Sequence, residues 1–197
     1  MKLGHIEAAV LCGGASSRMG REKATLPYRG GPLARRVANA LGACFARVRL
    51  VAKRDLAPEL GLETLVERRA EHAALVGLHA ALGACEASAV FVAACDLPDI
   101  DPRVVLALAA LAPTNGAADA IAPLGPSGPE PLFAIYRPRI LLEVERRLAA
   151  GELALRALLG ALNTLYVPER ELRALDPVLA SLHNLNRPGD ISRDDAW

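Results

Sequence analysis

The feature that most constrains the fold is an alternation of short apolar segments of strand length with apolar segments of helix length. Residues 6–12 predict a buried strand, residues 32–41 a helix that begins with proline, and residues 47–52 the next strand. The pattern continues with expected strands at residues 62–66, 89–94, 119–122, 132–136 and 164–167, and with expected helices at residues 73–84, 102–111, 139–149 and 153–159. It predicts an α/β fold with a doubly wound, mainly parallel sheet of the Rossmann-like type.

The length and the charge of the chain limit the classes of protein it can belong to. Its 197 residues suit a single domain over residues 1–197. Although 52% of the residues are hydrophobic, no apolar run reaches the roughly 18 to 20 residues of a membrane span, and Glu7 lies where a signal peptide would be apolar. We therefore expect a cytoplasmic protein without a membrane partner. A formal net charge of +1 gives no overall field for nucleic acid, so we expect no nucleic-acid partner and only local anion binding.

The four cysteines indicate buried thiols rather than a metal site. Cys12, Cys44, Cys85 and Cys95 form no C-x-x-C pair and lie in apolar surroundings. Such thiols are typical of a protein from a reducing compartment. We therefore expect no metal bound by thiolates.

A loop rich in glycine and basic residues follows the first expected strand. Residues 11–23 read LCGGASSRMGREK and contain three glycines and three basic residues. In open α/β sheets, ligands bind beyond the carboxyl ends of the strands. Gly13 and Gly14 would let backbone N–H groups approach an anion closely, and Arg18 and Lys23 would add charge-assisted contacts. The loop therefore predicts a cradle for a triphosphate.

The composition makes the lysine of this loop informative. Of the 23 basic residues only Lys2, Lys23 and Lys53 are lysines, so Lys23 is unlike the default cation of this chain. The loop matches neither G-x-x-x-x-G-K-[ST] nor G-x-G-x-x-G, which disfavours a P-loop ATPase and a classical dehydrogenase. A flexible turn with solvated charges is the alternative that the residues leave open.

A second candidate is the aspartate that follows the most apolar strand. Asp96 comes directly after residues 89–94, and Pro98 turns the backbone away, so the carboxylate should project at the same edge of the sheet. Mg²⁺ commonly binds one or two carboxylates together with substrate phosphates. The sequence therefore predicts a magnesium ligand. The alternative is that Asp96 pairs with an arginine or caps the following turn.

Two further features lie in the second half of the chain. Asn186 has the position of a cap for a short helix after Pro188, whereas a functional interpretation puts Asn184 or Asn186 beside Asp96, where it would orient the metal or a substrate phosphate. Residues 123–131, PLGPSGPEP, predict a loop that is either a plain connection or a lid over substrate.

Four motifs of the chain resemble, in order, those of the molybdenum cofactor guanylyltransferases, the MobA-like enzymes. LCGGASSRMGREK is similar to their opening L-A-G-G-x-S-x-R-M-G-x-D-K, and CDLP at residues 95–98 to their metal-bearing strand end. PLFAIY at residues 131–136 looks like their central strand, and NLNRPGD at residues 184–190 like their closing N-x-N-T-P-E-D. The resemblance spans nearly the whole chain and implies a nucleotidyltransferase fold.

The resemblance implies transfer of GMP from GTP to the terminal phosphate of molybdopterin, with release of pyrophosphate and with Mg²⁺ as cofactor. Alignment and charge stabilisation would then carry catalysis, since the attacking phosphate is already anionic. The implied nucleotide contacts are Leu11, Cys12, Gly13 and Gly14. Lys23 would stabilise the reacting phosphate, Arg18 would stabilise the leaving pyrophosphate, and Asp96 would bind the metal. We also expect a monomer that contacts the proteins of molybdoenzyme maturation transiently.

One implied contact concerns the base. The resemblance matches Glu67 to an acidic residue that contacts guanine, and the alternative is a surface partner of Arg68 or Arg69. Residues 73–77, AALVG, replace the usual G-P-L-x-G near the base, which weakens the expectation of GTP.

Two other functions stay open at this point. The first is a molybdopterin cytidylyltransferase or another NTP-dependent nucleotidyltransferase; such relatives tend to show L-A-A-G, so Gly13 and Gly14 favour guanine. The second is a non-catalytic nucleotide-binding module, which the joint presence of Arg18, Lys23 and Asp96 disfavours.

Overall fold

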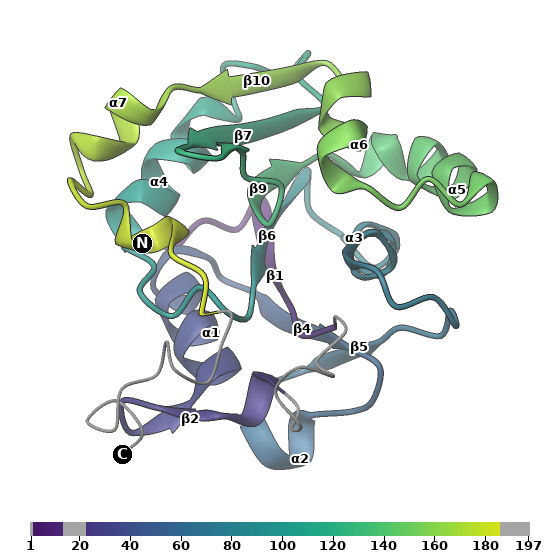
Figure 1. Ribbon diagram of the computed structural model, residues 1–197, viewed down its shortest axis with the longest axis vertical. Helices are drawn as coiled ribbons and strands as arrows, with labels where there is room; N and C mark the ends of the chain where they lie inside the picture. Colours follow the sequence, from purple (N-terminus) through teal and green to yellow (C-terminus); the bar gives the residue numbers. More distant parts are fainter. Residues whose placement is uncertain (1, 14–22, 186–197) are drawn as a thin grey trace.

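A single mixed sheet forms the centre of the computed structural model, which describes residues 2–13 and 23–185 (Figure 1). Its strands are, in sheet order, β10 (Thr164–Val167), β7 (Ala120–Gly125), β9 (Phe133–Tyr136), β6 (Ala89–Ala94), β1 (Ile6–Leu11), β4 (Val48–Ala52) and β5 (Thr64–Val66), and β8 (Gly128–Pro129) pairs with β7. β1 is parallel to β4 and β6, β4 to β5, and β10 to β7. The predicted doubly wound, mainly parallel sheet is confirmed.

The strand order reverses beside β1. The chain runs outward from β1 to β4 and β5 and then returns to form β6 on the other side of β1. In open α/β sheets such a switch point opens a crevice outside the carboxyl ends of the strands. The ends of β1 and β6 therefore mark the place where a ligand is expected.

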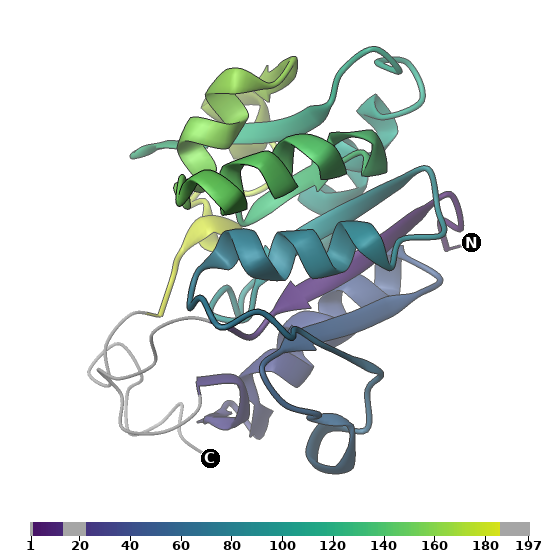
Figure 2. The ribbon, with the colours of Figure 1, turned by 90° about the vertical axis from the view of Figure 1, so that its right-hand side faces the viewer.

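Helices cover both faces of the sheet. One face carries α1 (Leu33–Cys44), α4 (Pro102–Leu111) and the short α7 (Glu169–Arg173), and the other carries α3 (Ala74–Gly83), α5 (Leu141–Ala150) and α6 (Leu155–Ala161), which lie in front in Figure 2. The side chains of β1 alternate between the two cores, with Ile6, Ala8 and Val10 on the α1 side. Burial on both faces explains why the strands read as continuous apolar runs.

The antiparallel strand β9 departs from the parallel pattern. It pairs with β6 and β7 in opposite direction to both. Only seven residues separate β7 from β9, and a parallel neighbour would need a crossover of about a dozen residues or more. The prediction that residues 123–131 form a loop, whether a plain connection or a lid, is wrong, because β7 continues to Gly125 and forms a hairpin with β8. Gly128 closes that turn at a φ of 102°.

Several short elements were not expected from the sequence. They are the hairpin of β2 (Pro27–Tyr28) and β3 (Gly31–Pro32), helix α2 (Ala57–Leu60), α7, and the 3₁₀ turns η2 (Lys23–Thr25), η3 (Pro138–Ile140) and η4 (Ala180–Leu182). In the β2–β3 hairpin both central residues have positive φ, 44° at Arg29 and 83° at Gly30, as two-residue turns of the I′ type require. The expected helix after Pro188 lies outside the described residues.

A buried ion pair joins β1 to β4 near the edge opposite the switch point. The side chains of Glu7 and Arg49 are 7% and 5% exposed. Arg49 donates to Glu7 Oε2 and to the carbonyl oxygen of Ala84 at 2.8 Å, while the backbone N–H of Glu86 donates to Glu7 Oε1 at 3.2 Å. Partners on several sides offset the desolvation of both charges.

The remaining sequence expectations about the whole chain concern cysteines and membranes. Cys12, Cys44 and Cys95 are buried thiols and Cys85 is half-buried, and none is in a disulfide. Within residues 2–13 and 23–185, no helix has the length and apolar character needed to cross a membrane.

Candidate active site

The glycine loop and Asp96 leave the sheet side by side. Leu11 of β1 lies opposite Ala94 of β6 in the parallel register. Beyond the strands, the N–H of Cys95 donates to Leu11 O at 3.1 Å and the N–H of Cys12 donates to Val51 O at 2.8 Å. These bonds extend the sheet by one residue, so Gly13 and Asp96 emerge at the switch point.

Lys23 and Asp96 form an ion pair at this edge. Lys23 Nζ lies 2.7 Å from Asp96 Oδ2, and the two side chains are 15% and 18% exposed. Ala24, in the same turn η2 as Lys23, is fully buried in the core on the α1 side and anchors that turn. Among the described residues the partner of Asp96 is thus this lysine, and neither of the alternatives, an arginine pair or a capping contact, is present.

The second oxygen of Asp96 is available to a cation. Asp96 Oδ1 is buried and has no hydrogen-bond partner within the described residues. Leaving a buried carboxylate oxygen unpaired is costly, and Mg²⁺ is a hard ion that takes oxygen ligands. In the described part of the chain no group of three or more acidic, histidine or cysteine side chains could hold a metal. The donor set therefore fits a Mg²⁺ ion that takes one protein carboxylate and completes its shell with substrate phosphate and water.

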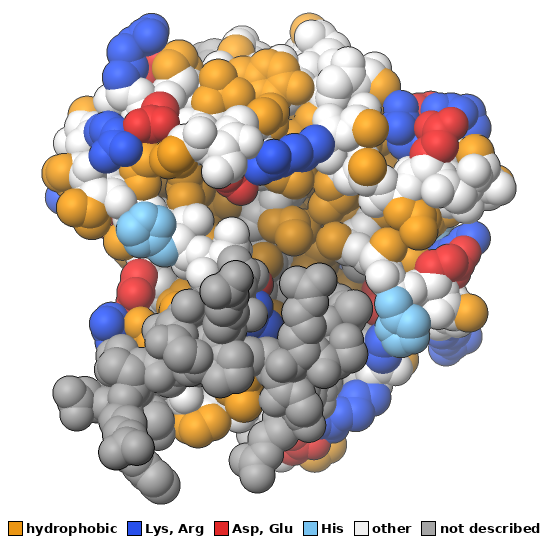
Figure 3. Space-filling view, viewed as in Figure 1, with side chains coloured by type: hydrophobic (Ala, Val, Ile, Leu, Met, Phe, Trp, Pro, Cys, Tyr) orange, Lys and Arg blue, Asp and Glu red, His pale blue; other side chains and the backbone are white. Residues whose placement is uncertain are grey.

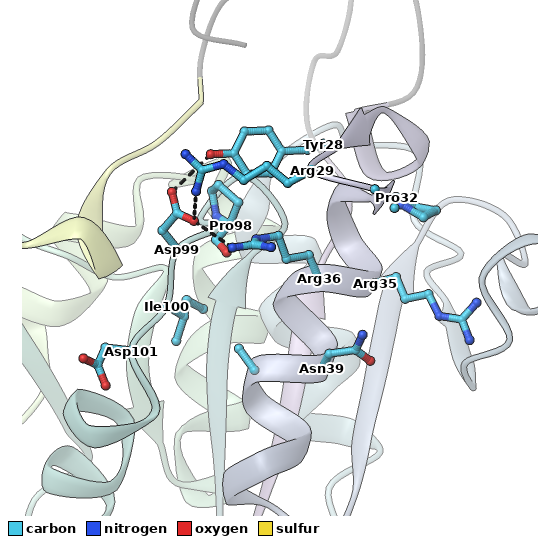
Figure 4. Close-up of a pocket in the computed structure, with 13 residues that line it drawn as sticks. Tyr28, Arg29, Pro32, Arg35, Arg36, Asn39, Pro98, Asp99, Ile100 and Asp101 are labelled. Carbon is cyan, nitrogen blue, oxygen red and sulfur yellow. Dashed lines mark hydrogen bonds and ion pairs between the residues drawn. The ribbon is translucent and has the colours of Figure 1, made fainter. Parts of the chain in front are cut away.

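Asp99 ties together the segments that carry Lys23 and Asp96 (Figure 4). Its carboxylate accepts hydrogen bonds from the Tyr28 hydroxyl at 3.2 Å, Arg29 at 3.0 Å and Arg36 at 3.1 Å, and Arg36 also donates to Pro98 O at 2.9 Å. The cluster borders a cavity of about 760 Å³ between the β2–β3 hairpin, α1 and the loop after Asp96. Because its oxygens are engaged, Asp99 serves to hold the two segments together rather than to bind a metal.

Glu67 lies against the first glycine of the loop. A Cβ atom added to Gly13 would come within 2.9 Å of Glu67 Oε1, so only glycine lets the carboxylate lie there. The Glu67 side chain is 3% exposed and pairs with Lys53, at 3.3 Å between Nζ and Oε1. The alternative of a surface partner for Arg68 or Arg69 is wrong, because the Glu67 carboxylate is buried and pairs with Lys53, while Arg69 pairs with Glu71. Like Asp96, Glu67 has a buried oxygen, Oε2, with no partner among the described residues.

A small cavity lies next to Asp96. The N–H of Leu185 donates to Asp96 O at 2.9 Å, which brings the last described residues alongside the site. Asn184 lines a cavity of about 200 Å³ together with Leu97, Glu130, Pro131, Leu132, Phe133, Arg156 and Leu182. Burial raises the pKa of Glu130, and the nearby positive charge of Arg156 opposes that rise. Figure 3 shows this face hollowed in the middle, with hydrophobic side chains gathered in the hollow.

The family is decided by a comparison of the sequence with known domains. Residues 8–165 match the family model of the MobA-like NTP transferase domain. The chain belongs to this family. Probable molybdenum cofactor guanylyltransferases of Pelotomaculum thermopropionicum and Deinococcus radiodurans are each 34% identical to it, over 92% and 95% of this chain and 88% and 92% of theirs.

A solved structure of the family has the same fold. Molybdopterin-guanine dinucleotide biosynthesis protein A from Archaeoglobus fulgidus superposes with a TM-score of 0.83 at 29% identity, covering 96% of each chain. The predicted resemblance and the nucleotidyltransferase fold are therefore confirmed.

One departure from the motifs of the MobA-like enzymes leaves the backbone of the site intact. Ala73 replaces the usual first glycine of G-P-L-x-G, but its φ of −139° and ψ of 148° are extended values that any residue adopts. Gly77 is retained, and a Cβ there would lie 3.2 Å from Leu11 Cδ1. In this chain α3 thus approaches the end of β1 closely without a glycine at residue 73.

The structure brings together some of the predicted site residues and adds others. Leu11, Cys12, Gly13, Lys23, Glu67 and Asp96 all lie at the switch point, and Asn184 lines the neighbouring cavity, whereas Gly14, Arg18 and Asn186 lie outside the described residues. Sequence reasoning assigned no site role to Lys53, Glu130 or Arg156. Two of these residues had a signal in the sequence: Lys53 is a rare lysine after a strand, and Glu130 lies between two prolines. Arg156 has no such signal, because arginine is common in this chain.

Proposed function

We propose that this MobA-like protein is a Mg²⁺-dependent molybdenum cofactor guanylyltransferase, which transfers GMP from GTP to the terminal phosphate of molybdopterin. The observation that carries the proposal is the pair of Lys23 and Asp96 at 2.7 Å, with a buried, unpartnered Asp96 oxygen at the edge where the glycine loop begins. The names of the two bacterial relatives support the same reaction. The proposal includes a cytoplasmic, monomeric enzyme in transient contact with molybdoenzyme maturation proteins.

The reaction requires alignment and charge compensation more than proton transfer. An anionic oxygen of the molybdopterin phosphate attacks the α-phosphorus of GTP, a new P–O bond forms, and the bond to the bridging oxygen breaks, so that pyrophosphate leaves with the electron pair. Lys23, a compact point charge, offsets the negative charge that gathers on the reacting phosphate. Asp96 would hold Mg²⁺, which when bound supplies further positive charge to the phosphate oxygens.

Glu67 suits the recognition of guanine. Guanine carries two adjacent donors, the N1–H and the 2-amino group, which can meet the two oxygens of one carboxylate. Glu67 is buried beside Gly13 and has one oxygen without a partner among the described residues. Cytosine and adenine each offer a single amino donor beside a ring nitrogen that is an acceptor, so they would satisfy at most one carboxylate oxygen, and this is the physical basis for preferring GTP.

The cavity beside Asp96 suits the acceptor. Its volume of about 200 Å³ is below that of sites enclosing a whole drug-sized ligand, so it fits one ring system rather than a nucleotide. The 2-amino-4-oxo edge of a pterin carries N–H donors and a carbonyl oxygen. Glu130 can accept hydrogen bonds from the donors, and Arg156 can donate one to the carbonyl oxygen. An acceptor bound there would lie next to Asp96 and hence next to the reacting phosphate.

Transfer of label tests the proposed function directly. Purified protein is incubated with molybdopterin, Mg²⁺ and α-labelled GTP, and the guanine dinucleotide product is separated and counted. We expect label in the product, at least tenfold less when label is supplied as CTP, and no product label from γ-labelled GTP. Equal transfer from CTP would identify a cytidylyltransferase. Absence of both transfer and pyrophosphate release with every nucleotide would identify a binding module.

Variants of the cavity should affect only the acceptor. We expect Glu130→Gln and Arg156→Ala each to raise the KM for molybdopterin by about ten- to a hundredfold, the usual effect of losing a hydrogen bond to a charged group. The KM for GTP should stay within twofold of the wild-type value. Steady-state kinetics with each substrate varied in turn measures both.

A matched control for Arg156→Ala is Arg170→Ala, because Arg170 is 81% exposed and its ion pair within residues 2–13 and 23–185 is a long one, 3.9 Å to Glu171. Its KM values should be unchanged. A cavity variant that raised the KM for GTP as much as that for molybdopterin would contradict the assignment of the cavity to the acceptor.

A further inference from the structure

We propose that Lys53 positions Glu67 for the recognition of guanine and is thereby a determinant of nucleotide specificity. The inference rests on the proposed use of GTP and adds the residue that holds the base-reading carboxylate in place. Lys53 is one of the three lysines of the chain, and it follows the second long strand of the sheet, β4.

The sheet itself places Lys53 next to Glu67. β4 and β5 are parallel neighbours with Ala52 opposite Val66, and the N–H of Glu67 donates to Ala52 O at 2.9 Å. Lys53 follows β4 and Glu67 follows β5, so the two residues leave the same edge of the sheet at matching positions. Their side chains meet at 3.3 Å between Nζ and Oε1.

The Lys53 ammonium group has three acceptors for its three N–H donors. Besides Glu67 Oε1, it donates to the backbone carbonyl oxygens of Arg69 and Glu71, both at 2.7 Å. Both carbonyls belong to the loop between β5 and α3. Lys53 therefore fixes the carboxylate and the loop that follows it in one arrangement, although its own side chain is still 29% exposed.

The carboxylate that Lys53 holds has the features of a ligand contact. Glu67 is 3% exposed, its Oε1 lies against Gly13, and its Oε2 is buried without a partner among the described residues. A buried charge needs a counter-charge and hydrogen bonds on its remaining lone pairs. Lys53 supplies the counter-charge, and a ligand with two adjacent donors, such as guanine, would supply the rest.

The compact ammonium suits this position better than a guanidinium would. Two carbonyls and one carboxylate surround a single nitrogen at 2.7 to 3.3 Å. The planar fork of arginine spreads its donors over three nitrogens and favours bidentate partners instead. Lys53→Arg therefore keeps the charge but not the arrangement, whereas Lys53→Met removes both.

The comparison of GTP with ITP isolates the role of Lys53, because ITP differs from GTP only by lacking the 2-amino group. Calorimetry with Mg²⁺ and each nucleotide, without molybdopterin, gives both dissociation constants. We expect wild-type protein to bind GTP about ten- to a hundredfold more tightly than ITP, the usual value of a hydrogen bond to a charged group. In Lys53→Met the ratio should fall below threefold, because GTP loses both contacts to the displaced carboxylate, whereas ITP, which keeps only the N1–H donor, loses one.

The control is Arg69→Ala, which removes a positive charge from the same loop but leaves the backbone carbonyl that accepts from Lys53. It should keep the wild-type ratio, and Lys53→Arg should give an intermediate one. A Lys53→Met protein that keeps the ratio, or that loses both nucleotides by the same factor, overturns the inference. If Lys53→Met does not fold, Lys53→Arg decides, since an unchanged ratio overturns the inference and a decrease of at least threefold supports it.

The outcomes separate this inference from the proposed function. A wild-type protein that prefers GTP over ITP in the manner described but transfers no label to molybdopterin contradicts the guanylyltransferase and leaves the role of Lys53 supported. A wild-type protein that transfers label but binds GTP and ITP equally supports the guanylyltransferase and contradicts the proposed role of Lys53.

Discussion

Replacement of Asp96 by asparagine is expected to lower kcat for GMP transfer by about a hundred- to a thousandfold, the cost typical of removing one stabilising group from a reacting phosphate or oxyanion. Asparagine has the same shape but carries no charge, so it would hold Mg²⁺ poorly. It would also leave Lys23, which lies 2.7 Å from Asp96, without its anionic partner. Turnover at matched, saturating Mg²⁺ together with a thermal unfolding curve measures the effect.

The fold should survive this change, because the side chain lies at the edge of the sheet and the strand before it is undisturbed. Asp119→Asn is the matched control. Asp119 precedes β7 at the opposite edge of the sheet, and the change removes its carboxylate and the surface pair that it forms with Arg139 at 2.7 Å. Its turnover should stay within twofold of wild type. Near-wild-type turnover of Asp96→Asn would refute the assignment of Asp96 to the metal.

Arg49→Ala is expected to lower the free energy of unfolding by about 3–5 kcal/mol, the cost of breaking a buried pair by removing one partner. Glu7 would stay buried at 7% exposure with only the longer contact to Arg47, at 3.8 Å, as counter-charge, and the carbonyl of Ala84 would lose its donor. Urea unfolding near pH 7, followed by circular dichroism, measures the loss. The pair lies away from the switch point, so the folded variant should retain the nucleotide preference of the wild type.

Two comparisons make the stability prediction specific. Arg146→Ala removes an arginine that is 55% exposed and pairs with Glu143 on the surface, so it should cost at most about 1 kcal/mol. The double variant Glu7→Leu with Arg49→Met removes both charges and should recover at least half of the loss, since apolar side chains can replace a buried pair. If Arg49→Ala lowered the free energy of unfolding by less than Arg146→Ala does, the importance of the buried pair would be contradicted.

Much of the fold could be predicted from the chain alone, because local periodicity reports local structure. The strand over residues 89–94, the helix over residues 102–111 and the strand over residues 164–167 have the bounds that the apolar pattern predicts. The β2–β3 hairpin and the direction of β9 could not be predicted in the same way. Two-residue strands show no periodicity, and strand direction depends on the length of the connection and on which neighbour the strand meets.

In the candidate site, too, the positions of some residues could be predicted from the sequence, but their contacts could not. The sequence predicted that Gly13 and Asp96 lie at the same edge of the sheet, because both follow apolar strands and residues that follow parallel strands leave the sheet at one edge. The contact of Lys23 with Asp96 joins residues 73 positions apart, and that of Lys53 with Glu67 joins the ends of two neighbouring strands. Glu130 and Arg156 meet at one cavity only because the β7–β8 hairpin and α6 come together.

The sequence by itself thus determined the α/β class, the glycine loop after the first strand and the carboxylate after the most apolar strand, because backbone propensity and apolar periodicity act over a few residues. Only the tertiary structure decided which charges pair, that Glu67 is a buried carboxylate against Gly13, and which residues line the cavity beside Asp96. Those contacts depend on strand order and helix packing, which are set by burial of the whole sheet on both faces and not by any one segment of the chain.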